Sequence, residues 1–162
     1  KIKGNINDYS LKNFKDYLKS DLFIVYGSTY IKGKLLNILK SKKAIGLHMG
    51  ISPYYRGTDC NFWATYDGRL ELVGATIYLL SDGLDDGNIL FHTFPKKSKN
   101  YFIFSMLAVK SAFECLVKNI ENNRILTEQA AVANSLASQA LEEYVQNCNA
   151  LQRYQARWQW LC

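Results

Sequence analysis

Few residues of this chain are suited to acid–base chemistry, and they fall into two groups. The first is a pair of histidines. His48 ends an apolar segment just before a Gly/Pro turn, and α/β proteins bind ligands at the carboxyl ends of their strands. His92 lies inside another apolar segment, where a structural role is the better interpretation. The second group is the loop 81–87, which holds three carboxylates and two glycines.

A carboxylate of this loop can meet the His48 imidazole if neighbouring strands carry the two groups. Such a partner orients the ring and favours its protonated form, which suits proton transfer. We therefore predict that a carboxylate of this loop faces the His48 side chain, in direct contact or through one water. Taken alone, the residues leave other interpretations open. His48 can be structural, and the acidic loop can be a turn or a cation site, although its spacing does not match an EF-hand.

The hydrophobic pattern predicts the elements that must position these groups. Residues 21–26 and 44–49 are apolar runs typical of buried parallel strands, and the spacing over 30–40 is helical, so a right-handed βαβ unit is expected. Further elements follow from the same reasoning: helices over 8–19, 58–66 and 101–122, a strand over 70–80 with a bulge at Gly74, and a strand over 89–94. The predicted fold class is α/β.

Composition limits the class of protein further. The length of 162 residues suits one domain, and 48% hydrophobic with 21% charged residues excludes a disordered or fibrous chain. No apolar run is long enough to span a membrane, and the first residues contain no signal-peptide core. The four cysteines are far apart and form no CxxC pair. These features predict a cytoplasmic protein with reduced thiols, no metal site and no membrane partner.

The net charge of +6 comes from the first third of the chain. Residues 1–50 carry ten Lys and three acidic residues, whereas the remainder is close to neutral. Most of these lysines are single residues on predicted helix surfaces, a distribution typical of a solvated face. Because no recognition motif accompanies them, we expect no specific nucleic-acid partner.

A change of composition near residue 125 predicts a boundary between a domain over 1–124 and a tail over 125–162. All Lys lie at or before Lys118, and all Gln lie at or after Gln129. The tail is rich in Ala and Gln and has high helix propensity. An ordinary helix is one interpretation; a different genetic origin, by fusion or a shifted reading frame, is the other.

His48 belongs to an ordered series of motifs. The segment 47–57 reads LHMGISPYYRG and is followed by Asn61-Phe-Trp63, Gly74-Ala-Thr76 and the loop 83–87. Together these motifs resemble the 10-formyltetrahydrofolate-dependent formyltransferases over about residues 21–94. The sequences of these motifs resemble those of the branch acting on sugars or other small amines more than those of the methionyl-tRNA or purine branches. The resemblance implies a Rossmann-like formyltransferase fold, with a mostly parallel sheet flanked by helices and an N-terminally truncated start.

The resemblance also implies a reaction. A formyl group passes from 10-formyltetrahydrofolate, the co-substrate, to the amino group of a small substrate, for which a nucleotide-linked amino sugar is one candidate. By the family's pattern His48 donates to the developing oxyanion and shuttles protons, while Asp85 aligns His48 and accepts the amine proton. The folate contacts implied are Gly27, Ser28, Tyr30, Gly83 and Leu84.

Three side chains within these motifs have alternative interpretations. Arg56 can contact an anion or pack the loop, and the sequence does not distinguish the two. Phe62 and Trp63 are interpreted as core residues rather than as a platform for substrate.

The chain departs from the family's pattern at two points. Gly46 stands where the family has an Asn two residues before the histidine, so restoring Asn at this position is predicted to raise formyl transfer. The strands that precede residues 21–26 in the family have no counterpart. We therefore expect an open sheet edge with Leu22, Phe23, Ile24 and Val25 bare, and self-association through it. An inactive relative that binds only a ligand or a partner, a pseudoenzyme, is the alternative to an active enzyme.

Overall fold

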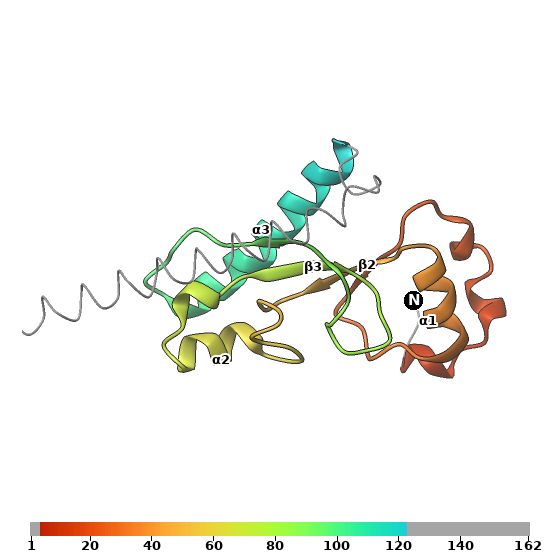
Figure 1. Cartoon of the computed structure of the whole chain (residues 1–162), viewed down its shortest axis with the longest axis horizontal. Helices are drawn as coiled ribbons and strands as arrows, with labels where there is room; N and C mark the ends of the chain where they lie inside the picture. The colour runs from red at the N-terminus through yellow and green to blue at the C-terminus, as the bar shows by residue number, and fades with distance from the viewer. Residues whose placement is uncertain (1–3, 123–162) are drawn as a thin grey trace, which may run out of the picture.

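The computed structural model describes residues 4–122, so the predicted boundary near residue 125 and the Ala/Gln-rich tail lie outside the described residues (Figure 1). Four strands and three α-helices follow one another along this part of the chain. Their order is β1 (Ile24–Tyr26), α1 (Gly33–Ser41), β2 (Ile45–His48), α2 (Cys60–Tyr66), β3 (Ala75–Leu79), β4 (Ile89–Thr93) and α3 (Tyr101–Glu121). The predicted α/β class is confirmed.

The strands form one sheet in the order β1-β2-β3-β4. β1 and β2 are parallel, so the predicted βαβ unit is present. However, β3 runs antiparallel to both β2 and β4. The expectation of mostly parallel pairing therefore does not hold within residues 4–122. The short connection between β3 and β4 allows only antiparallel neighbours, because a parallel pair needs a long crossover.

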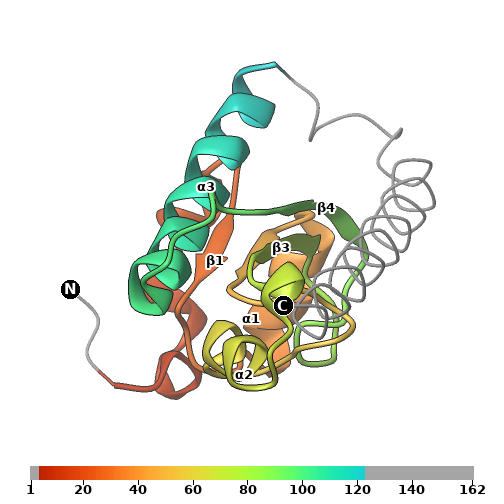
Figure 2. The same cartoon turned by 90° about the vertical axis from the view of Figure 1, so that its left-hand side faces the viewer.

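Side chains alternate between the two faces of the sheet, and each face has its own cover. Alternate residues of β2 (Ile45, Leu47) and β3 (Ala75, Ile77) pack against one side of α3. The positions of α3 that face them are small or apolar, Ala112 and Leu116. On the opposite face, α1 packs near β1 and the start of β2 through Leu35, Leu36 and Leu39. Figure 2 shows α3 and α1 on opposite sides of the strands. His48 belongs to the face opposite α3.

Two predicted elements differ from those observed. Residues 8–19 do not form an α-helix: three 3-10 turns span Ile6–Asp8, Leu11–Phe14 and Tyr17–Lys19. Side chains of Asn5 and Ser10 accept backbone N–H groups and start the first two turns separately. The strand predicted over 70–80 is a 3-10 turn, Leu70–Leu72, followed by β3.

Gly74 is not the predicted bulge; a Cβ there would lie 2.5 Å from the carbonyl oxygen of Thr93, so its role is to allow close approach of the two backbones.

β1 is the edge strand of the described sheet, as expected. Only one of the four side chains predicted to be bare is exposed there, Ile24 at 44%. Phe23 and Val25 pack against the α1 cluster, and Leu22 packs on the α3 side. Self-association through this edge stays a prediction. Within residues 4–122, no helix has both the length and the apolar content needed to cross a bilayer.

Candidate active site

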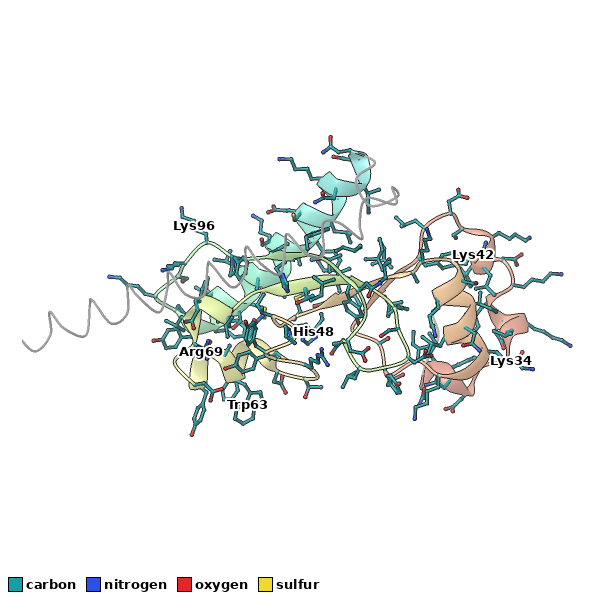
Figure 3. All side chains as sticks on the ribbon, in the orientation of Figure 1. Lys34, Lys42, His48, Trp63, Arg69 and Lys96 are labelled. Atoms are coloured by element: carbon teal, nitrogen blue, oxygen red, sulfur yellow. The ribbon has the colours of Figure 1, made fainter. Side chains whose placement is uncertain are left out.

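The centre of the candidate site is a buried contact between His48 and Asp85. His48 is the last residue of β2, and its side chain is 5% exposed, whereas that of Asp85 is 13% exposed. Nδ1 of His48 lies 3.2 Å from Oδ2 of Asp85. On the other side of the ring, Nε2 lies 2.9 Å from the carbonyl oxygen of Tyr55. The contact predicted between the two side chains is therefore present (His48 is labelled in Figure 3).

Both ring nitrogens of His48 face acceptor atoms. The carbonyl of Tyr55 can only accept, so Nε2 carries a proton and donates it. An imidazolium, with a second proton on Nδ1, also satisfies the carboxylate of Asp85. A substrate oxygen approaching Nε2 must therefore compete with the Tyr55 carbonyl for that proton.

Asp85 reaches His48 by a route that strand order alone does not suggest. Because β3 is antiparallel to β2, the loop after β3 starts at the opposite end of β2 from His48. The loop folds back across the sheet face, and Asp85 takes a left-handed backbone conformation with φ of 50°. Oδ2 accepts the backbone N–H of Gly57 at 3.0 Å, and Oδ1 accepts the hydroxyl of Tyr78 at 2.9 Å. Three neighbours thus orient one carboxylate.

The turn after β2 is attached to β3 through Thr76, which is fully buried. The hydroxyl of Thr76 accepts the N–H of Ser52 at 2.9 Å and donates to the carbonyl of Gly50 at 2.6 Å. The Ser52–Pro53 peptide bond is cis. The hydroxyl of Ser52 in turn donates to the carbonyl of Asp85 at 3.1 Å. These bonds connect the turn after β2 directly to the acidic loop.

His92, on β4, makes a further contact with the turn after β2. Its Nε2 lies 3.0 Å from the carbonyl oxygen of Ser52, and this carbonyl can only accept a proton. Burial lowers the pKa of His92, and the hydrogen bond to Ser52 opposes this effect without cancelling it. The geometry agrees with the structural role predicted for this histidine.

Replacing His92 with glutamine tests the pH dependence of this anchor. The unfolded chain, whose histidine pKa is about 6.5, takes up a proton before the folded chain as the pH falls. The free energy of unfolding therefore keeps the contribution of His92 above about pH 6.5 and loses it progressively below that value. A glutamine amide can donate to the same carbonyl without titrating. We expect His92→Gln to lose less stability than the wild type between about pH 6.5 and pH 5 in urea unfolding. Equal losses would assign the pH dependence to other groups.

Gly46 lies beneath the ring of Tyr78, and this corrects the prediction for an Asn at position 46. The two residues are direct partners across β2 and β3. A Cβ on residue 46 would lie 2.4 Å from Cζ and 2.8 Å from the hydroxyl oxygen of Tyr78. The space that an Asn side chain would need is therefore already filled. A single Gly46→Asn substitution cannot restore a donor without displacing Tyr78.

The residues proposed for folate come from two segments that the structure brings together. The hydroxyl of Tyr30 donates to the carbonyl of Asp82, which lies directly before Gly83. Gly27, Ser28 and Leu84 are exposed, and a Cβ on Gly57 would lie 3.9 Å from Leu84. The segment after β1 and the acidic loop are thus in contact through Tyr30 and Asp82. Their role in binding folate remains a proposal.

A cavity of about 470 Å³ lies between α2, the first turns of α3 and the end of β1. Neither His48 nor Asp85 lines it, but Gly57 and Cys60, which do, lie next to that pair. Burial, followed by the charge of Asp85, raises the pKa of Cys60 to about 11, so the thiol stays protonated near neutral pH. Within residues 4–122, no three His, Cys, Asp or Glu side chains are grouped as a metal site would require.

The interpretation of Phe62 and Trp63 as core residues is wrong. Phe62 is 58% and Trp63 49% exposed, because α2 buries its opposite face through Cys60, Asn61 and Ala64. The two rings contact each other and Tyr66, and Figure 3 shows Trp63 pointing outward from α2. Phe62 also lines the cavity. Arg56 is exposed in the turn that follows β2.

Sequence reasoning missed Tyr78 and Thr76 as parts of the site. Both lie on β3 and face the same side of the sheet as His48. Thr76 belongs to the Gly74-Ala-Thr76 motif, and a polar side chain inside an apolar strand is the signal that could have found it. Tyr78 could have been found only by pairing β3 with β2, which places its large ring opposite a glycine.

Comparisons with known proteins agree with this fold. No family model matches the chain. Over 88 residues it is 35% identical to a methionyl-tRNA formyltransferase of Finegoldia magna, a match that covers 53% of this chain and 27% of that protein. A phosphoribosylglycinamide formyltransferase from Anaplasma phagocytophilum superposes with a TM-score of 0.58 at 19% identity, covering 68% of this chain and 55% of that one. A 4-N formyltransferase from Francisella tularensis gives 0.54 at 24% identity, covering 71% and 49%.

The fold is that of the formyltransferases, as the resemblance of the motifs implied. The chain spans about a quarter of the length of the curated relative and about half of the length of the two solved structures. These relatives act, by their names, on different acceptors, so the branch is not decided by similarity.

Proposed function

We propose that this chain transfers a formyl group from 10-formyltetrahydrofolate to an amino group of a small substrate. The observation that carries the proposal is the buried contact of 3.2 Å between His48 and Asp85 on the formyltransferase fold. An amine that attacks a formyl carbon loses a proton and creates negative charge on oxygen. Asp85 is an acceptor for that proton, and Nε2 of His48 is a donor for that oxygen. The carbonyl then re-forms as the bond from the formyl carbon to the folate nitrogen breaks, and the proton passes to that leaving nitrogen.

The proposed acceptor is a small molecule with an aromatic or sugar portion, and a nucleotide-linked amino sugar has both. The cavity of about 470 Å³ has the size typical of small-molecule sites. Phe62, Tyr101 and Phe102 provide aromatic surface at its wall, and Asn61 and Ser105 provide polar groups. Aromatic side chains stack on flat rings and on sugar faces. Gly57, shared between this cavity and Asp85, connects acceptor and reaction centre.

The test is a formyl-transfer assay with the full chain and 10-formyltetrahydrofolate. A nucleotide-linked amino sugar, methionyl-tRNA and phosphoribosylglycinamide serve as alternative acceptors. We expect formylation of the amino sugar, and a loss of about 100-fold or more in His48→Asn, because the substitution removes the proton on Nε2. Folate binding without transfer to any acceptor would instead support a module that only binds ligand. Absence of both would refute the proposal.

A further inference from the structure

Tyr78 has a position that the formyl-transfer proposal does not yet use. It lies on β3, is 8% exposed, and crosses over Gly46 of the neighbouring strand. Its hydroxyl lies 2.9 Å from Oδ1 of Asp85. This bond reaches the oxygen of Asp85 that does not face His48.

The two oxygens of Asp85 have different neighbours. Oδ2 faces His48 at 3.2 Å and the N–H of Gly57 at 3.0 Å. Oδ1 accepts the hydroxyl of Tyr78. A carboxylate held at one oxygen only can rotate about its terminal torsion, which has a broad and shallow energy profile. The bond from Tyr78 removes that freedom and keeps Oδ2 directed at the imidazole.

Tyr78 is a donor that does not titrate in the ordinary pH range. Burial, together with the charge of Asp85, raises the pKa of Tyr78. The phenol therefore keeps its proton and can only donate toward the carboxylate. Gly46 is required for this arrangement, because any side chain at that position would meet the ring.

We infer that Tyr78 is a positioning residue, made possible by Gly46, which orients Asp85 and through it sets the hydrogen bonding of His48. In this chain the polar side chain beside Asp85 is Tyr78 on β3, whereas the family's pattern has an Asn on β2 at the position of Gly46. This inference rests on the proposed function for its effect on rate. Its effect on the imidazole does not depend on that function.

Tyr78→Phe is the experiment, because it removes the hydroxyl and keeps the ring over Gly46. The full chain is labelled with ¹⁵N-histidine. With two histidines, the ring nitrogen resonances are assigned by comparison with His92→Gln. We expect those of His48 to shift and those of His92 to stay. Where formyl transfer is measurable, kcat is expected to fall roughly 10- to 100-fold with little change in KM, and the pH profile of kcat/KM to move.

Tyr17→Phe, which alters an exposed tyrosine on the 3-10 turn Tyr17–Lys19, is the control and should change neither readout. If Tyr78→Phe does not fold by circular dichroism, fluorotyrosine at position 78 replaces it. This residue keeps the ring and makes the phenol a stronger acid, and it should shift the same resonances. A wild type without formyl transfer would refute the proposed function, while the resonances would still decide the role of Tyr78. Unchanged His48 resonances with either variant would overturn the inference.

Discussion

Asp85→Asn is expected to reduce kcat of formyl transfer by about 10²- to 10⁴-fold while the fold is retained. The carboxylate is the acceptor beside His48, and an amide has neither its charge nor its basicity. Asparagine is the appropriate replacement because it tolerates the left-handed backbone conformation that Asp85 adopts. Its amide oxygen can still accept one of the bonds from Tyr78 and Gly57. The loss should therefore reflect chemistry rather than unfolding.

The neighbouring carboxylate supplies a matched control for this experiment. Asp86→Asn makes the same change of charge one residue along the same loop, where the side chain is exposed and accepts from Ser81. We expect it to retain nearly full activity. Initial rates at saturating 10-formyltetrahydrofolate, together with urea unfolding, measure both variants. Equal losses in the two variants would assign the effect to general loop charge and exclude a specific role for Asp85.

Gly46→Ala is expected to lower the free energy of unfolding by about 1–3 kcal/mol, a large effect for one added methyl group. Its Cβ would lie 2.4 Å from the ring of Tyr78, so either the ring or β2 must move. Glycine is not needed at this position for its backbone conformation, since its φ is not positive. The cost therefore comes from space alone. Gly46→Asn should lower the free energy of unfolding further, and it should not increase formyl transfer.

A double-mutant cycle tests this explanation. Tyr78→Val removes the ring and keeps a strand-forming residue. We expect the variant that combines Gly46→Ala with Tyr78→Val to lose less free energy of unfolding than the sum of the two single losses. The reason is that the clash exists only when both larger groups are present. Urea unfolding of the four proteins measures the coupling. Additive effects would show that the ring does not occupy the space above residue 46.

The prediction of fold and site was most successful where a local pattern was sufficient. The apolar run over 44–49 and the helical spacing over 101–122 correspond to β2 and α3 within a few residues. The contact between His48 and Asp85 followed from the resemblance, because the residues alone left open which carboxylate of the acidic loop meets the ring. The residues over 8–19 were predicted less well, because hydrogen bonds from Asn5 and Ser10 compete with helix formation and carry no periodic signal.

The sequence by itself determined which segments bury an apolar face and which turns carry polar groups, because these properties depend on residues near one another in the chain. The tertiary structure decided how those segments meet. Antiparallel pairing of β2 and β3 placed Tyr78 opposite Gly46 and made the acidic loop fold back to bring Asp85 to His48. It also left Phe62 and Trp63 outside the core. Strand direction and loop path depend on contacts between residues distant in sequence, and a local pattern carries no record of them.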